Sequence, residues 1–346
     1  MSALYCGLLL SAAAAGGAGA CASAGAEAAP PAASAATAVA PAEAATLVPA
    51  PYAPDVLLRD GAWTFTPSIS TSGRLMAFAR WVNPVFTGPD SNAQQLYLAR
   101  RRADGEWSEP TVVPAFAEAR VDDPHFSPDG RWLYLASTRP HPDQPGYPTP
   151  AYEDFDLWRV PVSGDDIDWA AAAPVPCADC RRPKTPANWN IRYVNNETSP
   201  RLDTLGSLYY WTERTGTGGW RDVYVAPPTG NTDLPFGPEM RLPFNTARRE
   251  SGVAVTRDGR TVVFASEGRG GAGGSDLFRV DREGGAWGKP QSLGPSVNTA
   301  YEEARPELVG DTLLLFGTDA PVPGHRGVDA GEGARSYSVW GVKFRR

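Results

Sequence analysis

Short apolar segments separated by polar, glycine-containing turns recur along most of the chain, and this pattern predicts strands rather than helices. The clearest unit is residues 124–135, PHFSPDGRWLYL, in which a short strand, a tight turn and a second apolar strand follow one another. Self-similarity at intervals of roughly fifty to sixty residues indicates a repeat architecture. Four other segments share the pattern: Pro67–Phe78, Pro200–Tyr210, Val253–Phe264 and Pro306–Phe316.

A third strand is predicted after each of these pairs, and a fourth segment, often opening on a tryptophan, closes most units. The third strands are Gln95–Leu98, Asp156–Val160, Asp222–Val225, Asp276–Val280 and Tyr337–Trp340. The fourth segments are Trp107–Val113, Trp169–Val175 and Trp287–Leu293. Four antiparallel strands per repeat are typical of a β-propeller blade, so we predict an all-β chain built of such blades.

The repeat resembles that of the TolB-type β-propeller family, which is similar to WD-type blades. In that family the motif runs Pro-x-Phe-Ser-Pro-Asp-Gly, then an apolar strand, then Asp-Leu-Tyr. Residues 124–135 with 156–158 match it almost fully, residues 253–264 with 276–278 nearly so, and the glycine-rich turn at 268–276 is also similar. The resemblance covers about residues 60–346 and implies the propeller fold. It implies no particular function, because such propellers serve many roles.

We predict five blades, because five pairs of first and second strands occur; six blades, one of them degenerate, is the alternative. The last unit stops at its third strand, near Phe344. The apolar segment Asp55–Leu58 has no partner of its own, so we expect it to supply the outer strand of the last blade and to close the ring. Closure removes the open edges that a linear array would expose. The propeller domain is therefore expected to span residues 55–346.

The N-terminal segment is predicted to direct export. An apolar run at residues 8–15 precedes Ala18-Gly19-Ala20-Cys21, which resembles a lipobox with Cys21 as the lipidated residue. The segment departs from that motif in two ways: position 18 lacks the usual Leu, and no basic residue precedes the apolar run, since Arg59 is the first in the chain. Plain secretion after Ala22-Ser23-Ala24 and an uncleaved anchor are the alternatives. We assign residues 1–24 as a signal peptide or lipoprotein signal, and residues 25–54, rich in Ala and Pro, as a disordered linker.

The charge and the histidine count of the chain limit which classes of partner and cofactor we expect. The 32 Lys and Arg residues against 39 Asp and Glu give a formal net charge of −7, which argues against a nucleic-acid binder. Three His residues leave little material for a metal site, so we expect no metal and no cofactor. We expect a periplasmic monomer that meets a membrane only through its N-terminal anchor, as an outer-membrane lipoprotein if Cys21 is lipidated.

The long connections of the predicted propeller all emerge on one face, where binding usually resides. They are Pro140–Glu153, Pro176–Asn196, which holds Trp189 and Tyr193, and His325–Arg335. Connections from strand two to three and from strand four to the next blade share this face, because strands within a blade alternate in direction. The other interpretation is that these segments only cover blade edges.

Acidic residues recur near the start of first strands on that face. Three of them, Glu197, Glu250 and Glu303, follow one another at intervals of 53 residues. Asp122 and Asp123 occupy a similar place in the second blade. One hypothesis is an acidic ring that binds a cation or a basic partner segment. The favoured hypothesis is structural ion pairs between blades, formed with three arginines that follow second strands: Arg139, Arg214 and Arg269.

Two cysteines, Cys177 and Cys180, form a Cys-x-x-Cys motif. No second pair lies in the mature chain and no pair of nearby His completes four ligands, so a zinc site is not favoured. No helix is expected after the motif, as a thioredoxin-like site would need. In an exported protein the motif therefore predicts a local disulfide.

Signatures of enzymes are mostly missing from the sequence. No Gly-x-Ser-x-Gly elbow appears, and His125 falls inside a first strand, where a packed core residue is expected rather than a base. We therefore predict a non-catalytic binding or scaffold module for a protein or envelope ligand. The alternative is a glycan-active hydrolase that uses carboxylates on the axial face.

Overall fold

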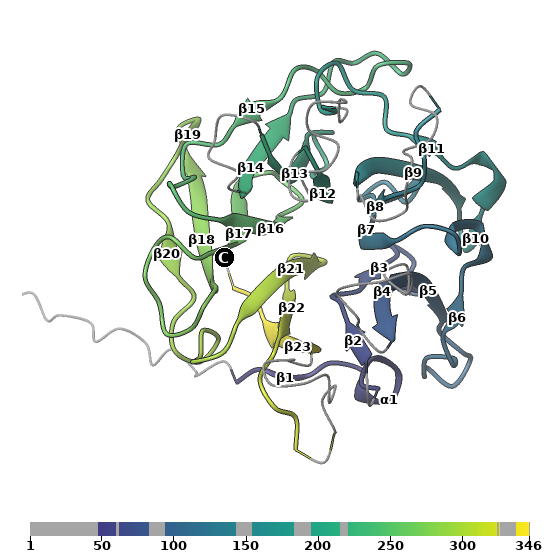
Figure 1. Ribbon diagram of the computed structural model, residues 1–346, viewed down its shortest axis with the longest axis horizontal. Helices are drawn as coiled ribbons and strands as arrows, with labels where there is room; N and C mark the ends of the chain where they lie inside the picture. Colours follow the sequence, from purple (N-terminus) through teal and green to yellow (C-terminus); the bar gives the residue numbers. More distant parts are fainter. Residues whose placement is uncertain are drawn as a thin grey trace, which may run out of the picture. The chain divides into compact units, whose positions relative to one another are not determined.

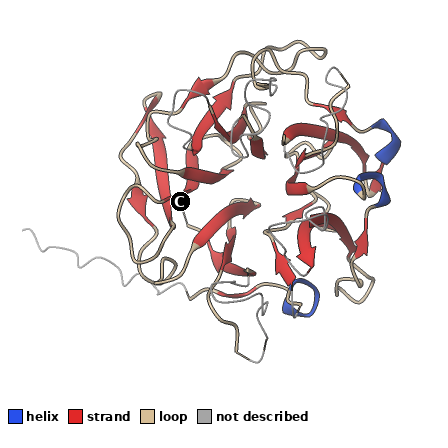
Figure 2. Ribbon diagram, in the orientation of Figure 1, coloured by secondary structure: helices blue, strands red, loops and turns tan. Residues whose placement is uncertain are grey.

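The strands form five small antiparallel sheets arranged as a five-bladed β-propeller, which confirms the fold and selects five blades over six (Figures 1 and 2). The computed structural model describes residues 48–59, 62–82, 94–142, 154–182, 195–214, 221–323, 325 and 337–345. The propeller belongs to a compact unit spanning Ala45–Arg346. None of the helices in these ranges is both long and apolar enough to cross a membrane.

Each blade is built from consecutive strands, apart from the last. Blade 1 comprises β2 (Ala62–Thr64), β3 (Ser68–Ile69), β4 (Leu75–Val82), β5 (Gln94–Arg100) and β6 (Thr111–Val112). Blade 2 comprises β7 (Val121–Phe126), β8 (Trp132–Ser137), β9 (Asp156–Ser163), β10 (Asp166–Ile167) and β11 (Ala173–Pro174). Blade 3 comprises β12 (Glu197–Leu202), β13 (Leu208–Glu213), β14 (Arg221–Ala226) and β15 (Met240–Arg241). Blade 4 comprises β16 (Glu250–Val255), β17 (Thr261–Ser266), β18 (Asp276–Glu283), β19 (Ala286–Trp287) and β20 (Gln291–Ser292). Blade 5 comprises β21 (Glu303–Val309), β22 (Leu313–Thr318), β23 (Ser338–Lys343) and the N-terminal β1 (Ala50–Pro51).

The hydrophobic core lies between blades rather than within a single centre. Each pair of neighbouring blades shares a cluster of buried side chains, such as Leu135 of blade 2 with Leu75 of blade 1, and Phe264 of blade 4 with Tyr209 of blade 3. Further clusters join blades 2 and 3, blades 4 and 5, and blades 5 and 1. This explains the alternating and continuous apolar strands of the repeat, because a sheet packed on both faces buries side chains on both.

The ring is closed by an N-terminal strand, but not by the segment expected from the sequence. Strand β1 pairs with β23, and the Tyr52 backbone N–H donates to the carbonyl of Val339 at 2.9 Å. The expected segment, Asp55–Leu58, instead contributes to helix α1 (Pro54–Leu57). Proline is favoured in the first turn of a helix, whereas an outer strand tolerates Pro51 because its missing N–H faces away from the ladder.

Two short 3-10 turns, η2 (Pro114–Phe116) and η3 (Trp169–Ala171), complete the described elements. Helix α1 packs Leu57 into the cluster between blades 5 and 1, and the buried Arg80 of blade 1 donates to the Val56 carbonyl at 2.5 Å. The closing segment is therefore fixed to both blades that it joins.

The first strand of blades 2 to 5 carries the same backbone kink. At the third residue of each strand φ is positive, between +43° and +55°, and the register with the second strand shifts there. These residues are Asp123, Ser199, Gly252 and Arg305. A bulge of this type bends the strand and redirects its side chains, here at the ends of the strands that surround the axis.

Candidate functional site

All five blades contribute to a cavity of about 290 Å³ around the propeller axis. It opens where first strands begin and second strands end, which is the face predicted to carry the long connections. Its lining is mixed, with aromatic rings, arginines, carboxylates and small polar side chains. The lining residues come from the inner strands β2, β7, β12, β16 and β21 and from the strand ends beside them (Figure 1).

Alternation along the first strands decides which side chains face this cavity. In blade 3 Asn196 and Thr198 line it, whereas Glu197 between them does not. The same holds for Glu250 between Arg249 and Ser251, and for Glu303 between Glu302 and Ala304. Successive side chains of a strand point to opposite sides, so the repeated glutamates point away from the cavity.

The three glutamates are structural equivalents, since each opens a first strand and pairs with a Thr or Ser of the second strand. Each is buried and hydrogen-bonded within the protein. Glu250 accepts from the Thr246 hydroxyl at 2.7 Å and the Ser266 hydroxyl at 2.8 Å. Glu303 accepts from the Thr299 backbone N–H at 2.9 Å. These carboxylates do not form a ring around the cavity.

The arginines expected to pair with these acids differ from one blade to another. Arg214 bonds the Glu197 carboxylate, within one blade rather than between two. Burial raises the pKa of Glu197 well above its ordinary value, and Arg214 opposes that effect. Arg139 instead lies over the Trp158 ring at 5.1 Å, and Arg269 donates to the carbonyl of Phe244. The repeated acid and the repeated arginine therefore form an ion pair in blade 3, whereas Arg139 and Arg269 make other contacts.

Asp122 and Asp123 do line the cavity. Asp122 lies one position further along the strand than the glutamates, and Asp123 is the bulge residue at which the alternation is interrupted. Val121 of blade 2 pairs with Ser137 as Glu197 pairs with Thr212. Arg305 Nη1 lies 2.5 Å from Asp122 Oδ1 and 3.0 Å from Asp123 Oδ1.

The two neighbouring carboxyls have divergent pKa values. Burial raises the pKa of Asp122, with Arg305 opposing it and the Asp123 charge adding to it. Burial acts in the same sense on Asp123, but Arg305, Arg201 and the Ser199 hydroxyl together lower the pKa of Asp123 below its ordinary value. Asp123 is thus the group held as a carboxylate.

The other carboxylates of the cavity also have protein partners. Arg221 pairs with Glu213 at 3.0 Å and Arg249 pairs with Glu267 at 3.6 Å. The Tyr337 hydroxyl donates to Glu302. The lining contains four arginines, Arg120, Arg221, Arg249 and Arg305, and five carboxylates, Asp122, Asp123, Glu213, Glu267 and Glu302, so the formal charges nearly cancel.

Aromatic rings form one wall of the cavity. Trp63 packs edge-on against Trp81, with ring centroids 5.8 Å apart, and against Tyr337 at 5.6 Å. Arg305 lies over the Phe65 ring at 4.2 Å. Arg120 lies 4.9 Å from the Trp81 centroid, and in blade 3 Arg221 lies 4.5 Å from that of Trp211.

A buried polar cluster connects first strands next to the bulges. Glu307 pairs with Arg201 at 2.5 Å and accepts from the Ser68 hydroxyl at 2.8 Å. His125 accepts the Leu202 backbone N–H at Nε2, 3.2 Å away, so its Nδ1 carries the proton and donates to Glu307 at 3.1 Å. His125 is thus a packed residue that ties blades 2, 3 and 5 together.

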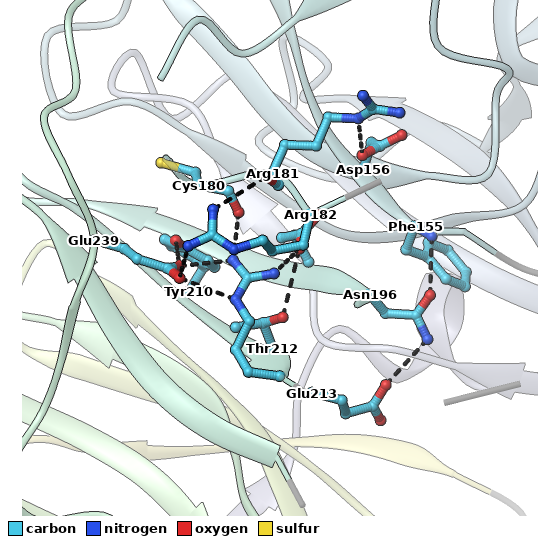
Figure 3. A network of polar contacts seen from close by, with 12 residues as sticks. Phe155, Asp156, Cys180, Arg181, Arg182, Asn196, Tyr210, Thr212, Glu213 and Glu239 are labelled. Atoms are coloured by element: carbon cyan, nitrogen blue, oxygen red, sulfur yellow. Dashed lines mark hydrogen bonds and ion pairs between the residues drawn. The ribbon is translucent and has the colours of Figure 1, made fainter. Parts of the chain in front are cut away.

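Cys177 and Cys180 form a disulfide beside blade 3. The Cys180 carbonyl accepts from Arg214 Nη2 at 2.6 Å, and Glu239 accepts from the same nitrogen at 2.6 Å (Figure 3). The Tyr210 hydroxyl also donates to Glu239. The disulfide segment is therefore attached to the arginine that neutralises Glu197.

The same figure shows the contacts of Asn196, a residue of the cavity lining. The Phe155 backbone N–H donates to Asn196 Oδ1 at 3.1 Å, and Asn196 Nδ2 donates to Glu213 Oε2 at 3.1 Å (Figure 3). These contacts fix three lining residues from two blades in one arrangement.

Most of the lining was not predicted from the sequence, including the tryptophans Trp63, Trp81 and Trp211 and the arginines Arg120, Arg249 and Arg305. The signal was present, because Asn196, Arg249 and Glu302 precede the repeated glutamates by one residue. Three predicted residues, Cys21, Trp189 and Tyr193, lie outside the described residues. Within the described ranges no group of three or more His, Cys, Asp or Glu could hold a metal ion.

No family model matches the chain, and no curated protein matches it by sequence. Solved structures with a similar fold include a putative TolB from Agrobacterium tumefaciens, with 15% identity, a TM-score of 0.45 and coverage of 82% of this chain and 91% of that one. A thermostable family-43 glycoside hydrolase has 10% identity, a TM-score of 0.49 and coverage of 82% and 91%. A protein of unknown function from Dyadobacter fermentans DSM 18053 has 12% identity, a TM-score of 0.46 and coverage of 86% and 98%. At these levels the likeness concerns the fold alone.

Proposed function

We propose that the protein is an exported TolB-type propeller that binds a protein or envelope ligand in its axial cavity without transforming it. The observation that supports this most is that every carboxylate of the cavity lining is engaged by an arginine or a tyrosine hydroxyl of the protein itself. A cavity whose carboxylates are already paired is organised to hold a ligand by shape and hydrogen bonds.

The proposal is tested by filling the cavity. Ser251→Trp places a large ring among the lining residues, and Thr204→Trp, on the exposed turn of the opposite face, is the matched control. After incubation with a bacterial envelope extract, native mass spectrometry should detect a retained ligand on the wild type and on Thr204→Trp. The Ser251→Trp variant should retain no ligand. If that variant does not fold, Ala304→Trp fills the same cavity and replaces it in the test. A ligand retained by folded, cavity-filled variants would place the binding site elsewhere.

A second candidate, the glycan-active hydrolase, is favoured by one observation. Asp122 has a raised pKa and Asp123 a lowered one, and neighbouring carboxyls with divergent pKa values can act as acid and base. If one of them is catalytic, Asp122→Asn should abolish turnover of a glycan that the wild type hydrolyses. The binding proposal instead expects no turnover by the wild type.

Membrane tethering is part of the proposal and rests on the lipobox-like sequence before Cys21. If Cys21 is lipidated, Cys21→Ala should shift from the membrane fraction to the soluble extracytoplasmic fraction. Fractionation unchanged by the substitution would contradict lipidation and leave plain secretion or an uncleaved anchor.

A further inference from the structure

We infer that the axial cavity takes a neutral saccharide of one or two sugar rings, an inference that rests on the proposed binding function. Three features of the lining support it: an aromatic wall, small polar side chains in the same cavity, and a buried hydroxyl, that of Thr198, which lacks a protein partner among the described residues.

The aromatic wall suits the apolar faces of a sugar. Trp63 is only partly buried, and the edge-on packing of Trp81 and Tyr337 against it fixes its orientation. An aromatic face carries negative charge density, which attracts the slightly positive C–H groups on one face of a pyranose ring. The partly exposed Trp63 ring is the member of this wall that we expect to stack on such a ring.

The rest of the lining suits the hydroxyl groups of a sugar. Ser251 and Ser275 offer hydroxyls, and the Arg221–Glu213 pair offers both donors and acceptors in fixed positions. The amides of Gln94 and Asn196 each use one donor and one acceptor on protein partners, which fixes their orientation, and that of Gln94 keeps a second donor and a second acceptor lone pair. Vicinal hydroxyls each donate and accept, so they need both kinds of partner at short spacing.

Thr198 gives an independent indication of a ligand. Its side chain lines the cavity and the residue is 2% exposed, yet its hydroxyl has no hydrogen-bond partner among the described residues. A buried hydroxyl without a partner is unfavourable, and a ligand hydroxyl would relieve it.

Charge and size exclude other classes of ligand. Four arginines against five carboxylates leave no excess of positive charge for a nucleotide and little negative charge for a cationic peptide. The volume of about 290 Å³ lies at the lower end of the range for small-molecule sites, which fits one or two sugar rings.

The test uses a glycan array of neutral and acidic oligosaccharides probed with the full chain. Thr198→Val keeps the shape of the side chain and removes the hydroxyl, and Thr204→Val, exposed on the opposite face, is the matched control. The wild type and Thr204→Val should bind neutral glycans, and Thr198→Val should bind them about 3- to 10-fold more weakly, as the loss of one neutral hydrogen bond implies.

A second readout keeps the inference testable if Thr198→Val does not fold. Because Trp63, Trp81 and Trp211 line the cavity, a neutral glycan from the array should change the tryptophan emission of the wild type. Trp63→Phe should reduce that change, whereas Trp287→Phe on an outer strand should retain it.

Three results would contradict a neutral saccharide as the ligand. The wild type would bind acidic glycans only, or it would bind no glycan, or the folded Thr198→Val variant would bind neutral glycans as tightly as the wild type. Failure of the saccharide inference is distinguishable from that of the binding function. Two results together would contradict the saccharide and still support the cavity as the binding site. They are a ligand from the envelope extract that the wild type retains and the cavity-filled variant loses, and the absence of binding to any glycan on the array.

Discussion

A residue in the left-handed region occupies the same position in four of the first strands, and Gly252 is the one where a side chain has no room. Its φ is +54°, and a Cβ placed there would lie 2.9 Å from the backbone N and Cα of Arg305 in the neighbouring blade. Asp123, Ser199 and Arg305 accept the same backbone with a side chain. Close approach of two inner strands therefore explains the glycine at this position.

We expect Gly252→Ala to lower the free energy of unfolding by about 1–3 kcal/mol, because it adds backbone strain and a contact with Arg305. Gly284→Ala is the control, since Gly284 has a φ of +57° but a Cβ added to it would meet no atom within 4 Å. The control should lose about 1 kcal/mol, from the positive φ alone. Urea unfolding measures both. Equal losses would show that the approach of Arg305 has no effect.

Glu307 gives a prediction on pH. Burial acts to raise its pKa, but Arg201, His125 and Ser68 lower it below the ordinary value of 4.5. A lowered pKa in the folded state means that the carboxylate stabilises the fold above pH 4.5 and that this contribution is lost as the pH falls through the folded-state pKa.

Glu307→Gln leaves Arg201 without its buried partner and should cost about 3–5 kcal/mol at neutral pH. The difference between wild type and variant should shrink as the pH falls below 4.5. Urea unfolding at a series of acidic pH values checks this. A difference that stays constant into the acid range would contradict the ion pair.

At the scale of elements, the two residues of β1 complete the last blade. A chain that begins at Val48 retains β1, whereas one that begins at Ala53 leaves β23 with an open edge. We expect the shorter chain to melt at a lower temperature and to associate at high concentration, because unpaired strand edges recruit partners. Calorimetry and light scattering measure both effects. Equal melting temperatures and monomeric behaviour for the two chains would show that β1 does not stabilise the ring.

Elements were predictable to the extent that local pattern determines them. The strand–turn–strand units and the third strands follow from apolar periodicity and turn residues, so all five blades could be placed from the sequence. The closing strand could not, because Ala50 and Pro51 have no apolar pattern and pair only through their backbone with Gly341 and Trp340. We predicted Asp55–Leu58 as the closing strand because this segment is more apolar, but residues 55–57 belong to helix α1.

At the scale of the whole molecule, the cavity exists only because five blades meet. The repeat correctly indicated which strand ends lie near the axis, but a one-residue offset separates Glu197 from the cavity-facing Asn196 and Thr198. That offset depends on strand register and on the bulge, which a repeat spacing does not determine. The aromatic wall was missed for a different reason, since Trp63 and Tyr337 come from blades 1 and 5 and meet only through ring closure.

Hydrogen–deuterium exchange of the full chain decides whether the axial cavity is the ligand site. Exchange is compared with and without the low-molecular-mass fraction of a bacterial envelope extract. We predict slower exchange at the cavity-lining starts of the first strands, in residues 119–124, 195–200, 248–253 and 301–306. Protection confined to the turns of the opposite face, in residues 127–131, 203–207 and 256–260, would contradict an axial site.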